Sequence, residues 1–259
     1  MKKVRVEAST KKDRTSEIFG NPMSKKVIRK AQKSKQKNQK KYGDDSKVNY
    51  QCIIRDNPCI GEPLGVKNVV VTRKEGKGSF DEEKGVIVGN IRMGFGHYRI
   101  SMAIASAAHA LGYTPYWMDL NSYPETTCTK LISAQNELYS LGSRISQKSK
   151  LFNKFVWEPV NYEGFRQLSY NAADQKNAEL MAPVYHSVPK DIPVIATHVW
   201  PAQAAVHAGM KHVVNAIPDN WPMALHYAQG SLHTVQTHYA YQGYRIGNGM
   251  MKDKVVQAM

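Results

Sequence analysis

From residue 85 onward, short apolar runs alternate with longer segments that have helical periodicity. Five of these runs are predicted strands and cover residues 86–91, 114–120, 192–197, 211–217 and 232–237. The first is apolar and rich in β-branched residues, as is typical of a buried parallel strand. Helices are predicted between them at 98–111, across much of 125–182, at 202–208 and at 239–246. Alternating strands and helices form right-handed βαβ units. The pattern therefore predicts an α/β fold with a Rossmann-like, mainly parallel sheet covered by helices on both faces.

The pattern differs before residue 85. Residues 1–48 contain 16 Lys and Arg against 5 Asp and Glu and predict a basic, disordered, low-complexity arm. Two apolar runs, at 50–54 and 66–72, predict a small β extension that continues as a loop to residue 84. The main domain is then expected at 85–250, and residues 251–259 are expected to begin a second half that is missing.

Charge and cysteine usage bear on partners and compartment. The chain of 259 residues has a formal net charge of +15, concentrated in residues 1–48, so the arm is either a solvated tail or a sequence-independent contact with polyanions. No aromatic side chain interrupts the basic run Lys25–Lys41, and we expect no specific nucleic-acid binding. Three scattered cysteines and the lack of a long apolar run indicate a cytoplasmic protein, with attachment to the inner face of the membrane left open.

A titratable residue lies at or shortly after the end of each of the five predicted strands. These residues are His97, Asp119, His198, Asp219 and His238. Ligands of open α/β sheets bind beyond the carboxyl ends of the strands, so the five side chains are expected to converge on one edge. Each also has a purely structural interpretation, such as a turn cap or a buried, hydrogen-bonded imidazole. The histidines lack the i, i+4 spacing of a helical metal site, and no metal is expected.

A glycine-rich turn connects the first of these strands to its helix. Its glycines allow close approach of a ligand to the backbone, and the helix N-terminus that follows favours anions. Asp119 lies 23 residues after Gly96, as in a dinucleotide-binding fingerprint, but Arg99 stands where the third glycine of that fingerprint belongs. An NAD(P)-dependent Rossmann oxidoreductase is therefore one alternative. A non-catalytic polyanion-binding module is another.

The motif Gly94-Phe95-Gly96-His97, followed by an Ala-rich helix, resembles the Gly-Gly-Gly-His-type loop of GT-B glycosyltransferases. The similarity is greatest to monogalactosyldiacylglycerol synthases and processive diacylglycerol glucosyltransferases, in their N-terminal half. Two further segments resemble that family and occur in the same order along the chain. They are the strand that ends in Thr-His at residue 198 and the stretch from Val213 to Pro222. The resemblance extends over about residues 85–250.

This resemblance implies a hexosyltransferase built from two halves. The half represented here takes a lipid-type acceptor. The donor is a sugar nucleotide (a UDP-sugar), which the missing C-terminal half is implied to hold. No cofactor is implied in this chain. His97 is implied as the catalytic base and Asp219 as a catalytic residue that supports it. The implied acceptor-binding residues are Gly94, Phe95, Gly96, Asp119, His198, Trp221 and His238.

The segment 148–170 interleaves aromatic and basic side chains. One interpretation is a helix whose apolar face packs on the sheet. The other is an interfacial element on an anionic membrane surface. The resemblance favours the second interpretation, because lipid-glycosylating relatives reach their acceptor with this region. The expected membrane contacts are Phe152, Phe155, Trp157, Lys150 and Lys154.

Overall fold

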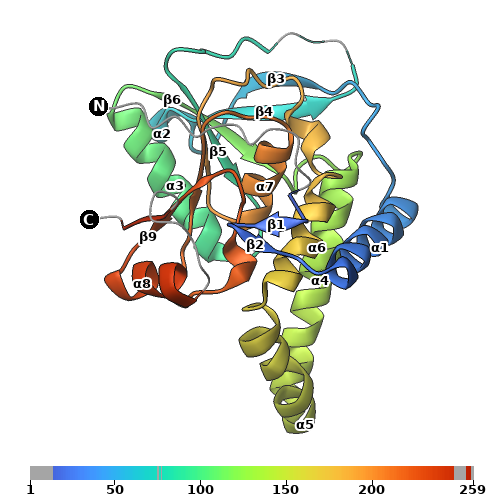
Figure 1. The fold of residues 1–259 in the computed structure, drawn as a ribbon. Helices are drawn as coiled ribbons and strands as arrows, with labels where there is room; N and C mark the ends of the chain where they lie inside the picture. The colour runs from blue at the N-terminus through green and yellow to red at the C-terminus, as the bar shows by residue number, and fades with distance from the viewer. Residues whose placement is uncertain (1–13, 75, 77, 248–254, 258–259) are drawn as a thin grey trace.

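The computed structural model describes residues 14–74, 76, 78–247 and 255–257 (Figure 1). An eight-stranded sheet has the strand order β10-β9-β8-β7-β5-β6-β4-β3, and every neighbouring pair except β3 and β4 is parallel. The strands are β3 (Gln51–Asp56), β4 (Lys67–Thr72), β5 (Gly85–Asn90), β6 (Thr114–Asp119), β7 (Val194–Ala196), β8 (Val213–Ala216), β9 (Leu232–Val235) and β10 (Val255–Gln257). The predicted α/β fold with a mainly parallel sheet is confirmed.

Along the chain, most of the helices lie between strands of this sheet. They are α1 (Lys25–Tyr42), α2 (Gly61–Leu64), α3 (Phe95–Ala110), α4 (Thr127–Lys148), α5 (Lys150–Phe152), α6 (Leu168–Ala178), α7 (Val199–His207) and α8 (His238–Gly247). Two π-helices (Asn153–Trp157 and Val160–Gly164), two 3₁₀ turns (Ala182–Tyr185 and Ala224–His226) and a short hairpin of β1 (Glu17–Ile18) and β2 (Asn21–Pro22) complete the described elements.

Helices cover both faces of the sheet, as alternate side chains of β5 show. Val88 packs in one apolar cluster with Ala105 of α3. Ile87, which points to the opposite face, belongs to the main cluster with Trp200 and Ala204 of α7. Because both faces are buried, β5 has no exposed position, and its continuous apolar run follows from this environment.

The strand order reverses between β5 and β7. The chain passes from β5 to β6 on one side, then crosses back over β5 to place β7 on its other side. The carboxyl ends of β5 and β7 therefore flank a topological switch point, which is the usual ligand position of an open α/β sheet.

The basic segment is folded over most of its length. Residues Lys25–Tyr42 form helix α1, which packs against α6, buries Ala31 and is joined to α6 by an ion pair between Lys35 and Glu179. The expectation of a disordered arm is therefore wrong for residues 25–42, while residues 1–13 lie outside the described part of the chain. Contacts with α6, which is more than 120 residues away, stabilise a helix that local composition does not predict.

Two further expectations change because strands pair over long distances. The strands at 50–54 and 66–72 are confirmed, but they do not form a separate extension, because β4 pairs in parallel with β6 of the main sheet. Residues Val255–Gln257, expected to belong to a second half, pair in parallel with β9 and extend the same sheet.

A helical hairpin, formed by residues 127–164, projects from the body of the molecule (Figure 1). Helix α4 forms one arm, and α5 with the π-helices forms the other. The arms meet through Tyr139 and Trp157, whose ring centroids are 5.1 Å apart, and the Trp157 ring leaves no room for a Cβ at Gly142. No helix within the described residues is long and apolar enough to cross a membrane.

Candidate functional site

A cavity of about 840 Å³ lies beyond the carboxyl ends of β5, β7 and β8. His97, His198 and Asp219, which follow these three strands, all line it. The opposite wall is largely apolar and includes Leu131, Leu138, Tyr139, Trp157, Phe165 and Tyr170. The structure therefore brings three of the five strand-end residues together at the switch point.

His97 lies in the first turn of α3, and its ring is held by the backbone directly after β7. Its Nδ1 lies 2.6 Å from the carbonyl oxygen of Thr197. A carbonyl oxygen only accepts hydrogen bonds, so Nδ1 carries the proton, and the neutral ring keeps its lone pair on Nε2. Burial lowers the pKa of His97 below its usual value of 6.5. At neutral pH, His97 is therefore an uncharged imidazole with an unprotonated Nε2.

His198 has the opposite tautomer. It is the N-cap of α7, where its Nδ1 accepts a hydrogen bond of 3.2 Å from the backbone N–H of Trp200. Its neutral ring therefore carries the proton on Nε2. Desolvation, and then the neighbouring His97, lower the pKa of His198 well below 6.5. The two rings meet edge to face with centroids 5.0 Å apart, so an acceptor and a donor imidazole lie side by side.

Asp219 belongs to a line of three polar groups. Its Oδ2 lies 3.2 Å from Nε2 of His226, and Nδ1 of His226 lies 2.6 Å from the hydroxyl of Tyr244. The hydrogen bond from His226 lowers the pKa of Asp219, so this carboxylate is ionised at neutral pH. Burial raises the pKa of Tyr244, which keeps its hydroxyl proton and can donate it to His226.

Buried amide side chains hold the loop that carries His226. Each donates to a carbonyl of that loop, and the bonds are Asn171 to Ala224 and Tyr227 (both 2.8 Å), Gln203 to Tyr227 (2.7 Å) and Asn215 to His226 (2.7 Å). These donors come from α6, α7 and β8, so three core elements set the position of His226. Satisfied buried networks of this kind restrict a loop to one arrangement.

Asp174 of α6 also lines the cavity, and it is only 6% exposed. The indole N–H of Trp200 lies 3.5 Å from its Oδ2. Burial raises the pKa of Asp174 to about 7. Sequence analysis missed Asp174, His226 and Tyr244, because none of them directly follows a predicted strand. His226 was visible only as a histidine in the segment after Asp219.

The other strand-end candidates lie outside the cavity lining. Asp119 forms an ion pair with Arg92 at 2.8 Å and accepts hydrogen bonds from Asn121 and Ser122. It therefore acts as a turn cap, and its occupied carboxylate gives a ribose-binding role no support. His238 begins α8, is exposed and stacks on Tyr241.

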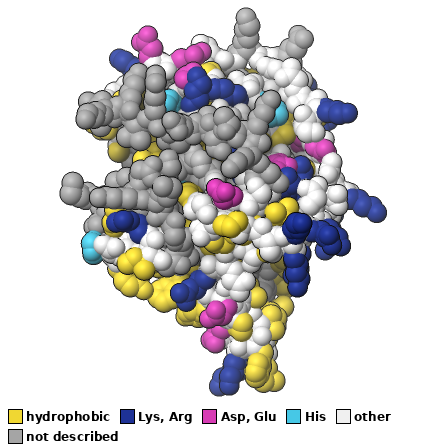
Figure 2. Space-filling view, in the orientation of Figure 1, with side chains coloured by type: hydrophobic (Ala, Val, Ile, Leu, Met, Phe, Trp, Pro, Cys, Tyr) yellow, Lys and Arg dark blue, Asp and Glu magenta, His cyan; other side chains and the backbone are white. Residues whose placement is uncertain are grey.

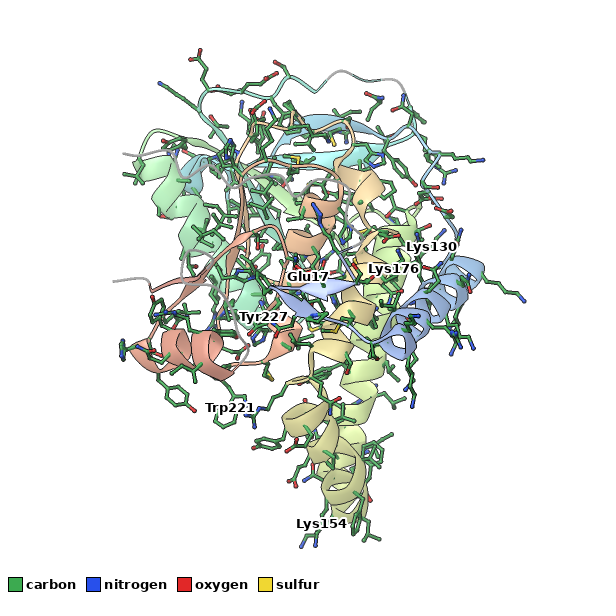
Figure 3. The ribbon with its side chains drawn as sticks, in the orientation of Figure 1. Glu17, Lys130, Lys154, Lys176, Trp221 and Tyr227 are labelled. Atoms are coloured by element: carbon green, nitrogen blue, oxygen red, sulfur yellow. The ribbon has the colours of Figure 1, made fainter. Side chains whose placement is uncertain are left out.

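The remaining acceptor-binding candidates are exposed rather than part of the cavity wall. Phe95, between Gly94 and Gly96, is 79% exposed. Trp221, labelled at the edge of the molecule in Figure 3, is 43% exposed and packs on Tyr239 and Arg166. None of these residues lines the cavity defined by the described residues.

The expected membrane contacts lie on the hairpin. Phe155, Lys150 and Lys154 are exposed, whereas Phe152 and Trp157 are partly buried. Figure 2 shows hydrophobic side chains gathered at the lower end of the molecule beside Lys and Arg, and Figure 3 places Lys154 near this end. The apolar side chains of the hairpin therefore do not all pack into the body of the protein.

No group of three or more His, Cys, Asp or Glu in the described parts of the chain is arranged to hold a metal ion. Comparison with curated proteins and with solved structures finds no match. One family model, described as a domain of unknown function (DUF6937), matches residues 17–246, which include the whole cavity lining. The chain therefore belongs to the DUF6937 family.

Proposed function

We propose that the chain is the acceptor-binding half of a hexosyltransferase that acts on the hydroxyl group of a lipid-type acceptor. The observation that carries the proposal is the unprotonated Nε2 of His97 in a cavity at the switch point of the sheet. A neutral imidazole within reach of an acceptor hydroxyl is suited to general base catalysis. In this proposal the sugar nucleotide is held outside these 259 residues.

His97 takes the acceptor hydroxyl proton onto Nε2 as the hydroxyl oxygen attacks C1 of the sugar. The new bond joins that oxygen to C1, and the bond between C1 and the nucleotide phosphate breaks, so that the nucleoside diphosphate leaves with the electron pair. Asp219 interacts electrostatically with His97 and raises the pKa of its ring against the effect of burial. The ionised Asp219 therefore stabilises the imidazolium that forms.

The volume and lining of the cavity suit an acceptor with an apolar portion. Its wall is formed by aromatic and aliphatic side chains of α4 and the returning arm of the hairpin, such as Leu138 and Trp157. Pockets of this size and polarity bury most of a small apolar ligand and orient it with a few polar groups. The imidazoles of His97 and His198 are two of the polar groups of this lining.

The hairpin supports delivery of such an acceptor from an anionic membrane surface. Leu151 is 72% exposed and Phe155 is 67% exposed, and the ammonium groups of Lys150 and Lys154 lie beside them in the chain. Apolar side chains that enter the headgroup region, together with lysines that contact anionic lipids, are typical of interfacial helices. The same hairpin contributes wall residues to the cavity, so membrane and cavity are connected by one element.

Photolabelling tests this proposal with the chain as it is. Vesicles that contain a diacylglycerol with a photoreactive group near its free hydroxyl are irradiated with the protein, and labelled peptides are identified by mass spectrometry. We expect labelling around His97 and in residues 218–226 that is competed by unlabelled diacylglycerol. Labelling confined to the hairpin, or equal labelling by a phosphatidylcholine probe, would contradict an acceptor site in the cavity.

A further inference from the structure

The carboxylate of Asp174 is buried in the cavity wall without a cationic partner among the described residues. Its only hydrogen-bond donor there is the indole N–H of Trp200, at 3.5 Å from Oδ2, which is long for a hydrogen bond. The side chain is 6% exposed, so water solvates it poorly. Buried carboxylates are normally paired with a cation or fully hydrogen-bonded. The carboxylate of Asp174 can therefore accept further hydrogen bonds from a ligand.

Aromatic rings surround this end of the cavity. Tyr170 lies one helical turn before Asp174 on α6, and its ring meets that of Phe165 with centroids 4.9 Å apart. The Trp200 indole, whose N–H faces Asp174, also contacts His198 at 4.7 Å between ring centroids. Phe165, Tyr170, Trp200 and Asp174 all line the same cavity. A carboxylate among aromatic faces is the arrangement that binds organic cations.

We propose that Asp174 anchors a subsite for an organic ammonium group, with the rings of Tyr170, Trp200 and Phe165 as its walls. A protonated amine would donate to the carboxylate oxygens and replace the solvation that burial removes. The site is suited to an amine because a neutral hydroxyl would supply hydrogen bonds but leave the buried charge uncompensated. The inference concerns ligand binding and does not depend on the proposed transferase activity.

The other charged and titratable groups of the cavity do not satisfy Asp174. Lys37 and Lys41 reach the lining from α1, but both are exposed, and the Lys41 ammonium lies over the ring of Tyr42. The line of Asp219, His226 and Tyr244 is paired within itself. His198 and His97 are held neutral by their lowered pKa values, and Tyr170 keeps its proton because Asp174 and burial raise its pKa.

Burial raises the pKa of Asp174 to about 7, which supports the inference. Near neutral pH a large fraction of the carboxyl group is protonated in the empty protein. A bound ammonium group favours the ionised form and lowers that pKa, so binding must release protons from Asp174. Amine affinity should therefore rise as the pH increases through 7 and become constant once the carboxylate is fully ionised.

The test uses phenethylamine and phenethyl alcohol, which have the same shape and differ in charge. Both are titrated by calorimetry into the native chain, Asp174→Asn and the control Asp191→Asn, whose carboxylate is 63% exposed and pairs with Lys211. We expect the amine to bind the native chain and the control more tightly than the alcohol does. Asp174→Asn should weaken amine binding at least about tenfold and leave alcohol binding unchanged.

A second measurement does not depend on a variant. Calorimetry of the native chain with phenethylamine at pH 7, in two buffers of different ionisation enthalpy, gives the number of protons released on binding. We expect a net release that disappears at pH 9. Failure of phenethylamine to bind the native chain, equal binding of amine and alcohol, or amine binding without proton release would overturn the inference.

Discussion

The Nδ1 atom of His97 lies 2.6 Å from the carbonyl oxygen of Thr197, a residue 100 positions later in the chain. This bond connects the turn after β5 with the end of β7 across the switch point. The hydroxyl of Ser101 adds to the same connection, because it lies 2.9 Å from both the His97 carbonyl oxygen and the Thr197 hydroxyl. The orientation and the tautomer of the proposed base therefore depend on the register of two adjacent parallel strands.

Replacement of the proposed base should abolish most of the activity. In a polypeptide that contains both halves, His97→Gln should lower hexosyl transfer from a UDP-sugar to diacylglycerol by about 10²–10⁴-fold, because general base assistance is lost. The matched control is His238→Gln, since His238 is exposed and outside the cavity. Radiolabelled lipid product measures the rate. Equal turnover in both variants would show that His97 is not the base.

Stability should decrease in acid because of His198. Its pKa is well below 6.5 in the folded protein, so below pH 6.5 the unfolded chain binds a proton that the folded chain does not. The free energy of unfolding therefore falls as the pH drops from about 6.5 toward the folded pKa. His198→Asn keeps an N-cap side chain but does not titrate, and its stability should fall less over this range. Urea unfolding at several pH values measures the difference; parallel pH profiles would contradict the burial of a neutral His198.

The stability of the loop that carries His226 should depend on the hydrogen bonds of Asn171. Asn171→Ala leaves the buried carbonyls of Ala224 and Tyr227 without this donor and should cost about 1–3 kcal/mol in the free energy of unfolding. Asn153→Ala serves as control, because the side-chain amide of Asn153 donates to Glu158 within the exposed hairpin and not to the core. Chemical denaturation of both variants provides the comparison. A loss no greater than that of the control would show that the amide does not support the loop.

The hairpin should bind anionic vesicles through side chains that contribute little to folding. The double variant Leu151→Ser and Phe155→Ser should lose vesicle co-sedimentation while its melting temperature stays close to that of the native chain, since both side chains are mostly exposed. Leu111→Ser is the matched control, because Leu111 is 75% exposed at the end of α3. If the control loses binding to the same extent, the hairpin is not the contact. Undiminished binding of the double variant would lead to the same conclusion.

The strands and part of the site could be predicted because their signals are local. The runs at β5 and β7 are apolar and β-branched since both sheet faces are buried, and a residue directly after such a run must lie near the carboxyl edge. This rule brought together His97, His198 and Asp219. It did not hold for Asp119, because β6 lies on the far side of β5 from β7 and its end is closed by Arg92.

Features that depend on distant partners could not be predicted in this way. Helix α1 is a basic run whose order depends on packing against α6, and β10 is a three-residue strand defined by its pairing with β9. Asp174 lies within a helix of small and polar residues. Its raised pKa results from burial in the cavity wall beside Trp200, which the local sequence does not reveal. His226 and Tyr244 are 18 residues apart and form a pair only because α8 returns to the loop.

Nuclear magnetic resonance of the chain labelled with ¹⁵N at histidine tests the central claim most directly. His97 is assigned with the His97→Gln variant, and its ring correlations are followed as a function of pH. We expect a neutral ring at pH 7 with the proton on Nδ1, an unprotonated Nε2 and a pKa below 6.5. A ring protonated on Nε2 could not serve as the base in this geometry, and a pKa above 6.5 would contradict the burial that keeps the ring neutral; either result would contradict the account.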